Sequence, residues 1–166
     1  MKTLDPITLR RVTAEIRDEL KKLDDLFTEW ESHRLGEWTD TFYLRGKASI
    51  DHDFYCGVEN IFRRIAAELN GGLPNGGSWH KTLLQNMLLE IPEVRPSVVS
   101  GETGKLLKTF LEFHHKFCHV YGFDLDFNQL DDLERLYPET HSAVGADVSK
   151  FLQFVGELIT DLEKNA

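Results

Sequence analysis

Residues 104–127 read GKLLKTFLEFHHKFCHVYGFDLDF, and both the fold and the candidate site are inferred outward from this stretch. Side chains three and four positions apart share one face of a helix, so the apolar residues predict a helix with a single stripe turned to a core. That stripe consists of Phe110, Phe113, Phe117 and Val120. The helix is expected to end at Gly122. Beside the stripe stand His114, His115, Lys116, Cys118, His119 and Tyr121. A stable helix does not require so many imidazoles and a thiol, so their concentration predicts a functional site.

The N-terminal part of the chain predicts two long helices. Asp5 followed by Pro6 is typical of the cap and first position of a helix, which we expect to run to about Arg34. A second helical pattern extends from about Thr39 to Leu69. Its middle carries Asp51, His52, Asp53, Cys56 and Glu59. Polar groups on a core-rich helix either face solvent or belong to a site.

The remaining segments are also helical in pattern. The sequence NGGLPNGG at 70–77 predicts a loop, and Ser78 predicts the cap of a short helix. Ser100 or Thr103 would cap the helix of the first stretch. The C-terminal segment begins helically, is expected to break near Pro138, and resumes toward the end of the chain. The chain therefore predicts an all-α fold, an antiparallel up-and-down helical bundle with about four principal helices plus a short helix.

Composition narrows the class of protein. The chain has 166 residues, 41% hydrophobic and 28% charged, which predicts one globular domain over 1–166. Its start lacks an apolar signal core and no long apolar run follows, so we expect a cytoplasmic protein with no membrane span. The net charge of −9 disfavours a broad nucleic-acid-binding surface, so any RNA contact must be local or supplied by a dimer groove or a partner. Cys56 and Cys118 are expected to be reduced thiols.

Three interpretations of the histidine-rich segment compete. In the first, the imidazoles satisfy backbone or carboxylate groups at the edge of the bundle. In the second they bind a metal, because His115 with His119 and His52 with Cys56 have i, i+4 spacing and Glu112 precedes His115 by three residues. Zinc would suit such mixed donors, whereas di-iron bundles need more Glu-x-x-His motifs than this chain has. We expect the site to use neither a metal nor a cofactor.

The third interpretation is acid-base chemistry. Histidine titrates near neutral pH, so two imidazoles could remove a proton from one oxygen and give one to another. Metal-free RNA cleavage needs such a pair and a cation to stabilise the phosphorane charge. His119 and His114 could form the pair, with Lys116 or an Arg from the second helix as the cation.

Three blocks in this order, FYCGVENIFRRIA, LPNGGSWHKTLLQNM and FHHKFCHVYGFDLD, make the chain resemble the HEPN superfamily and, within it, the HepT-like toxins. The resemblance covers most of the chain. It implies an up-and-down bundle that forms a homodimer with its groove at the interface. It also implies metal-independent ribonuclease activity and a minimal nucleotidyltransferase antitoxin that can attach AMP to a tyrosine.

The resemblance assigns roles residue by residue. The signature His falls on His119 and the signature Tyr on Tyr121, whereas the signature Arg falls on His114 and a second Arg on Cys118. Glu59 would orient His119 or an Arg across the bundle, or would simply pair with the neighbouring Arg63 at i, i+4. His80 is expected to anchor the glycine-rich loop. The catalytic candidates are thus His119, His114, Tyr121 and Glu59.

Three functions follow from these assignments. The first is a HepT-like toxin that cleaves RNA. The second is a HEPN module without catalysis that binds a nucleotidyltransferase. The third is a His/Cys metal-binding bundle.

Overall fold

The structure is a computed structural model that describes residues 5–35, 40–121 and 124–165. These ranges form five helices and no β-strand, with one isolated bridge between Ile91 and Arg95. The helices are α1 (Pro6–His33), α2 (Thr41–Leu69), α3 (Trp79–Leu88), α4 (Gly101–Phe117) and α5 (Phe127–Lys164). In the part of the chain that is described, none of the helices is long and apolar enough to cross a lipid bilayer.

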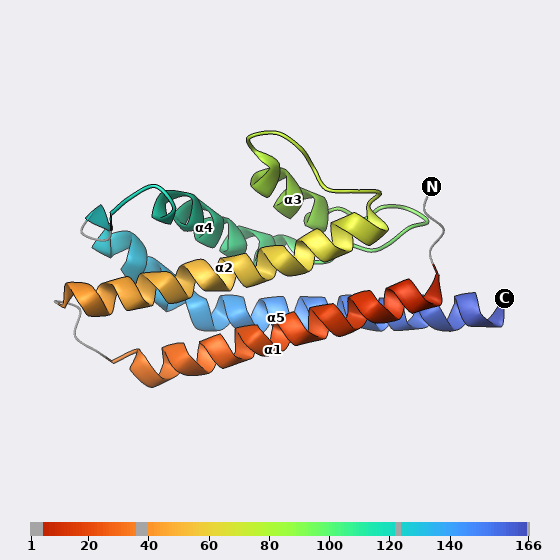
Figure 1. Cartoon of the computed structure of the whole chain (residues 1–166), viewed down its shortest axis with the longest axis horizontal. Coiled ribbons are helices and arrows are strands. Elements are labelled where there is room, and N and C mark those ends of the chain that lie inside the picture. Colours follow the sequence, from red (N-terminus) through yellow and green to blue (C-terminus); the bar gives the residue numbers. More distant parts are fainter. Residues whose placement is uncertain (1–4, 36–39, 122–123, 166) are drawn as a thin grey trace.

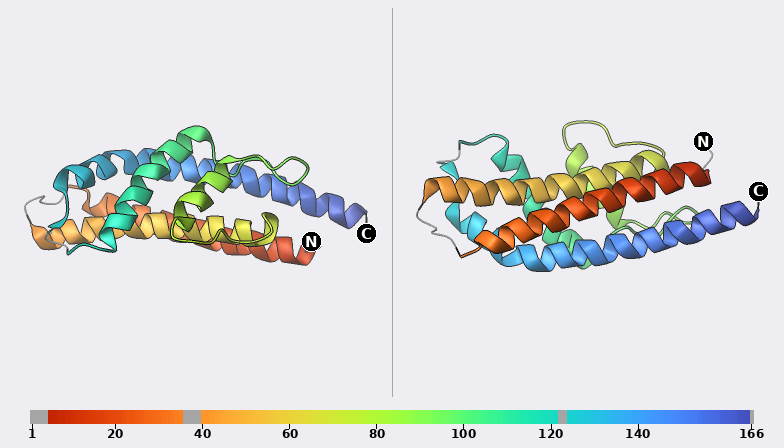
Figure 2. Two further views of the ribbon diagram at one scale, coloured as in Figure 1. Left: turned by 90° about the horizontal axis from the view of Figure 1, so that it is seen from above. Right: turned by 60° about the horizontal axis from the view of Figure 1, so that its bottom comes forward.

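The four longer helices form an up-and-down bundle. Figure 1 shows α1 and α2 running in opposite directions, with α5 alongside them and the described ends of the chain at one end of the bundle. α4 packs on both α2 and α5, and the short α3 packs on α2 and α4. The two turned views in Figure 2 show the same arrangement, with α3 and α4 on one side of the long rods. The expected all-α bundle is confirmed.

Side-chain caps fix the helix starts that matter for the site. The backbone N–H of Thr8 donates to Asp5 Oδ1 at 2.9 Å, and that of Thr103 donates to Ser100 Oγ at 3.1 Å. Asp147 of α5 accepts hydrogen bonds from the Ser100 N–H at 2.9 Å and from the Thr103 hydroxyl at 2.6 Å. Such caps stabilise a helix by about 1 kcal/mol. They confirm Asp5 and, of the two expected caps of α4, Ser100, and they pin the start of α4 to α5.

α4 is shorter than the sequence suggested. It ends at Phe117 with Cys118 as its C-cap, where the His119 N–H donates to the Lys116 carbonyl at 3.0 Å and closes a tighter turn. Val120, expected in the core stripe, is 42% exposed. The last positions of the predicted helix combine weak helix formers with no core to cover, so the segment turns away instead. The expected stop at Gly122 and the expected start at Thr39 lie outside the described residues.

α5 continues through Pro138, where a break was expected. A proline removes one helical hydrogen bond and pushes against the preceding turn, which bends a helix without having to end it. Figure 1 shows α5 bent between its cyan start and its blue remainder. Leu133 and Tyr137 on one side of the proline and Val144 and Val148 on the other are all buried. Packing of both halves on the same bundle therefore overrides the local preference to break.

An aromatic cluster joins α2, α4 and α5 at the centre of the core. The rings of Phe54 and Phe110 meet edge to face at a centroid distance of 5.1 Å, and Phe54 meets Tyr137 at 4.8 Å. All three residues are fully buried. Burying each such ring contributes about 1.5–3 kcal/mol, and the edge-to-face geometry adds somewhat more. This cluster sets the distance at which α4 lies against α2.

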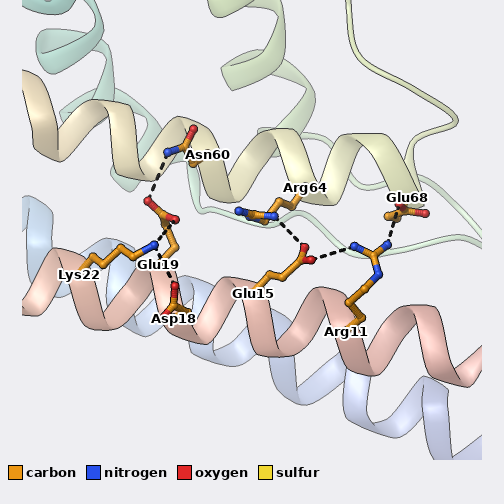
Figure 3. A network of polar contacts seen from close by, with 8 residues as sticks. All are labelled: Arg11, Glu15, Asp18, Glu19, Lys22, Asn60, Arg64 and Glu68. Atoms are coloured by element: carbon orange, nitrogen blue, oxygen red, sulfur yellow. Dashed lines mark hydrogen bonds and ion pairs between the residues drawn. The ribbon is translucent and has the colours of Figure 1, made fainter.

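A surface network joins α1 to α2 on the outer face of the bundle (Figure 3). Glu15 accepts from Arg64 at 2.7 Å and from Arg11 at 2.9 Å, and Arg11 also reaches Glu68 at 3.3 Å. Exposed ion pairs of this kind contribute about 0–1 kcal/mol each. The network matters for the site because it includes the Arg64 guanidinium. The neighbouring arginine on α2, Arg63, is directed elsewhere.

A second polar group is buried between α2 and α5. Lys47 Nζ donates to Glu134 Oε2 at 2.8 Å, and the Trp30 indole N–H donates to the same oxygen at 2.9 Å. Asp51 is fully buried, and among the described residues neither of its carboxyl oxygens has a hydrogen-bond partner. Burial, and then repulsion by Glu134, raise the pKa of Asp51 well above its usual value, although Lys47 opposes the shift. Burial thus favours the protonated, uncharged form of the Asp51 carboxyl.

We expect Asp51→Asn to stabilise the protein at alkaline pH. An unfolded Asp51 ionises above about pH 4, whereas the raised pKa lets the folded carboxyl keep its proton to higher pH, so wild-type stability falls as pH rises above about 4. The amide cannot ionise, and its advantage over wild type should grow to the order of 1–3 kcal/mol by about pH 8. Urea unfolding between about pH 4 and pH 8 measures the difference. Asp132→Asn, at an exposed position, controls for the change in net charge, and parallel pH curves for wild type and Asp51→Asn would contradict the assignment.

Candidate functional site

The contact between α2 and α4 changes character along its length. Up to Phe110 and Phe113 it is apolar, and one residue further His114 turns inward with only 8% of its surface exposed. Opposite His114 lie His52 and Cys56, which are one helical turn apart on α2. The apolar seam thus ends in a group of imidazoles and thiols where the C-terminal turn of α4 crosses α2.

Four side chains, here called the donor cluster, bring nitrogen and sulfur atoms together. They are His52, Cys56, His114 and Cys118. Cys56 Sγ lies 3.7 Å from His114 Nδ1 and 3.8 Å from His52 Nε2. Cys118 Sγ lies 3.5 Å from the same His52 Nε2. The two imidazole rings stack at a centroid distance of 4.6 Å and 12° between planes. Both cysteines are free.

A second pair, Glu59 and His80, borders the donor cluster. Glu59 is buried and accepts a hydrogen bond from His80 Nδ1 at 2.5 Å. The His80 ring also stacks on Trp79 at 3.6 Å, and the Arg63 guanidinium lies 5.6 Å from the Trp79 ring. His80 was expected to anchor the loop. Glu59 was expected either to orient His119 or an Arg across the bundle, or to form an ion pair with Arg63. In the structure these two side chains are hydrogen-bonded to each other through His80 Nδ1. The other ring nitrogen of His80, Nε2, is the one left to act on a further group.

Burial keeps two members of the donor cluster, His114 and Cys56, uncharged at neutral pH. It lowers the pKa of His114 to about 4, and the neighbouring imidazoles of His52, His80 and His115 add to the effect. Burial, followed by the charges of Asp53 and Glu59, raises the pKa of the Cys56 thiol to about 11. His114 is therefore a neutral imidazole and Cys56 a protonated thiol at pH 7. Neither supplies the fixed positive charge of an arginine.

His119 and Tyr121 lie elsewhere, on the exposed turn after α4. Both side chains are exposed, Tyr121 to 74%. The Asp124 N–H donates to the Tyr121 carbonyl at 2.9 Å and shapes the chain there. Lys116, in the last turn of α4, donates to Gln129 of α5 at 3.4 Å. The four catalytic candidates are thus divided, with His114 and Glu59 inside the bundle and His119 and Tyr121 at its surface.

Sequence reasoning undervalued His80 and Cys118. His80 opens a short helix after a glycine-rich loop, and no periodic pattern relates it to Glu59, which is 21 positions earlier. Cys118 was named as a neighbour of the core stripe, as a reduced thiol and as the position of a second signature Arg, but not as a partner of His52. Its i, i+4 relation to His114, which repeats that of His52 and Cys56, was the available signal.

Comparison with known proteins gives one match. A family model described as HepT-like protein matches residues 48–155, which is more than half of the chain. The matched range includes the donor cluster, the Glu59–His80 pair and the exposed turn. A search among curated proteins and a search among solved structures each returned no match.

In the metal-free protein we expect His114 to titrate at about pH 4. Unfolded histidine takes up its proton near pH 6.5, so the unfolded chain binds a proton that the folded state refuses, and stability falls as pH drops from about 6.5 to about 4. NMR of the imidazole resonances measures the titration, and denaturant unfolding measures the stability. His114→Gln should remove this part of the slope, while His33→Gln, at an exposed position, should not. A His114 resonance that titrates near pH 6.5 would contradict its burial.

Proposed function

We propose that this chain, which belongs to the HepT-like family of the HEPN superfamily, is the toxin component of a toxin–antitoxin pair and cleaves RNA without a metal ion. The observation that carries the proposal is the position of His119 and Tyr121. These two residues, at the places of the signature His and Tyr, project from an exposed turn directly after α4. A polymeric substrate can reach such a turn without any rearrangement of the bundle.

His119 would act on the ribose and phosphate. As a base it takes the proton of the 2′-hydroxyl, whose oxygen then attacks the adjacent phosphorus while the bond to the leaving 5′-oxygen breaks. An acid returns a proton to that 5′-oxygen, and the product is a cyclic phosphate. Lys116, whose carbonyl accepts from the His119 N–H, is a cation within the same turn and would offset the developing charge. The Tyr121 hydroxyl would donate a hydrogen bond to a phosphate oxygen.

A second imidazole is needed as the acid that completes the reaction. His114 is the partner indicated by the signature spacing, but it is buried and its low pKa leaves it without a proton to give at pH 7. In a homodimer with the groove at the interface, as the resemblance implies, each chain would contribute one His119, and the two would serve as base and acid. His114 and Glu59 then act inside the bundle, Glu59 by orienting His80.

A second candidate is a module that binds a nucleotidyltransferase and has lost catalysis. Two observations favour it. The positions of both expected arginines carry His114, which is neutral here, and Cys118. The net charge of −9 also opposes RNA. In that case the exposed Tyr121 hydroxyl would be the group on which the partner acts.

An RNA cleavage assay decides between the two candidates. With tRNA and mRNA, in EDTA and without added metal, wild type should cleave, and His119→Ala should be slower by about 10²–10⁴-fold because a positioned acid or base is lost. His33→Ala, at an exposed position on α1, is the matched control and should cleave as wild type does. Undiminished cleavage by His119→Ala, or none by wild type, would refute the ribonuclease proposal.

Modification of Tyr121 is tested separately. With ATP, Mg²⁺ and a minimal nucleotidyltransferase, we expect the Tyr121 hydroxyl to displace pyrophosphate from ATP and to gain one AMP. Intact-protein and peptide mass spectrometry measure the addition. Tyr121→Phe should gain nothing, whereas Tyr43→Phe, a partly buried tyrosine on α2, should be modified as wild type is. AMP on another residue would remove Tyr121 as the acceptor.

A further inference from the structure

The geometry points to a zinc site: we propose that His52, Cys56, His114 and Cys118 bind one Zn²⁺ ion with four protein ligands. The site goes beyond the proposed function, because an ion held by four side chains has no open position for a substrate and acts structurally. It also departs from the expectation of a metal-free protein.

The four donors come from two matching pairs. His52 and Cys56 are separated by one turn of α2, and His114 and Cys118 by one turn at the end of α4. Each pair is a His followed four residues later by a Cys, the spacing that places two donors on the same face of a helix. Because α2 and α4 pack on each other, the two pairs face one another across the seam. Three of the donors, His52, Cys56 and His114, have their ligand atoms within 4.8 Å of one another.

The distances between donors suit tetrahedral zinc. With Zn–S near 2.3 Å and Zn–N near 2.0–2.1 Å, a tetrahedral ion separates its sulfur and nitrogen ligands by about 3.6 Å. Three sulfur-to-nitrogen distances in the donor cluster are 3.5, 3.7 and 3.8 Å. These contacts serve as thiol-to-imidazole hydrogen bonds in the metal-free protein, and they bring each thiol to an imidazole nitrogen at the spacing that a shared ion requires. Cys118 lies outside the group of three, so its side chain must turn toward Cys56 and His114 to complete the set.

The neighbours of the cluster supply the outer contacts of a metal site. His52 would bind through Nε2, which lies 3.5 Å from Cys118 Sγ, while its Nδ1 lies 3.3 Å from the Asp53 carboxylate; Cys56 Sγ is nearly equidistant from the two ring nitrogens, at 3.7 Å from Nδ1 and 3.8 Å from Nε2. A carboxylate on the far nitrogen of a ligating histidine is the usual outer contact and fixes the ring and its tautomer. On the other side, His114 approaches Glu59 and His80.

Charge favours the ion as well. On binding, the two thiols release their protons to solvent, and the two thiolates neutralise Zn²⁺, so the half-buried site holds no net charge. Asp53 and Glu59 place carboxylates beside the donor cluster, and these would attract a cation to the same place.

The ion would hold the end of α4. Cys118 is the C-cap of that helix and the last residue before His119. A bond from Cys118 to an ion shared with α2 would fix where the exposed turn leaves the bundle, and with it the directions of His119 and Tyr121. The proposed ion is thus placed to position the turn while remaining outside the reaction.

The first test measures metal on the intact chain, purified in a phosphine reductant without chelator. We expect about one zinc per chain by elemental analysis. Co²⁺ titrated into the stripped protein should give the visible spectrum of a tetrahedral ion and a thiolate-to-cobalt charge-transfer band. Binding without that band, or no binding, would overturn the proposal.

Variants test the ligand set. Cys118 is exposed, so Cys118→Ser should fold, halve the charge-transfer intensity, weaken zinc binding by at least about 100-fold, and abolish the rise in melting temperature that zinc gives wild type. Asp53→Asn, which removes only the outer contact, should weaken binding by about 10–100-fold. His115→Ala removes the adjacent, exposed imidazole and should bind as wild type does. Wild-type affinity in Cys118→Ser would overturn the four-ligand site.

One further variant excludes a competing site. Glu59, His80 and His114 also bring three ligand atoms within 4.8 Å of one another. His80→Ala should leave cobalt affinity and its thiolate band unchanged, and loss of both would assign the metal to that group instead. All of these readouts are made without RNA, so a failure of RNA cleavage and a failure of the zinc site are separate results.

Discussion

The packing of α4 against α2 is the contact on which the candidate site depends. Phe54, Phe110 and Tyr137 fix the spacing of the two helices, and that spacing continues along both axes because helices are stiff over several turns. Whatever side chains follow the aromatic residues must therefore meet. Here they are His114 on one helix and His52 and Cys56 on the other. The core thus does more than stabilise the fold, since it sets the distances between sulfur and nitrogen at the end of the seam.

The same contact separates His114 from His119. On a helix, five residues correspond to a rotation of about 140° beyond a full turn, so these two imidazoles could not both face α2 even if α4 continued. Because α4 ends at Phe117, His119 leaves the seam altogether. The segment therefore has two parts with different chemistry. His114 is a buried, neutral imidazole, whereas Lys116, His119 and Tyr121 are exposed to solvent. Family motifs written along the sequence treat the two parts as one.

This division explains which features of the fold and of the candidate site could be predicted from the sequence. Apolar periodicity and caps gave the helices and the bundle, because those signals are local: Asp5 and Ser100 cap the helices they were expected to cap. The end of α4 and the passage of α5 through Pro138 were missed, because tertiary packing decides both. At the site, His52 with Cys56 is visible in sequence, whereas the meeting of Glu59 with His80 depends on how α3 docks and has no sequence signal.

The charge at the seam bears on both proposals. Arginines at positions 114 and 118, where the resemblance places them, would bring two positive charges to the end of α4. His114 is neutral at pH 7 and a cysteine carries no positive charge, and a zinc ion with two thiolate ligands would also leave the site neutral. The proposed ion would therefore join α2 to α4 without supplying the attraction of those arginines for phosphate. Positive charge that attracts RNA must therefore come from outside the seam, from Lys116 at the end of α4 or from Arg63 over Trp79. In the proposed reaction, the residues that contact RNA lie on that surface and not in the seam.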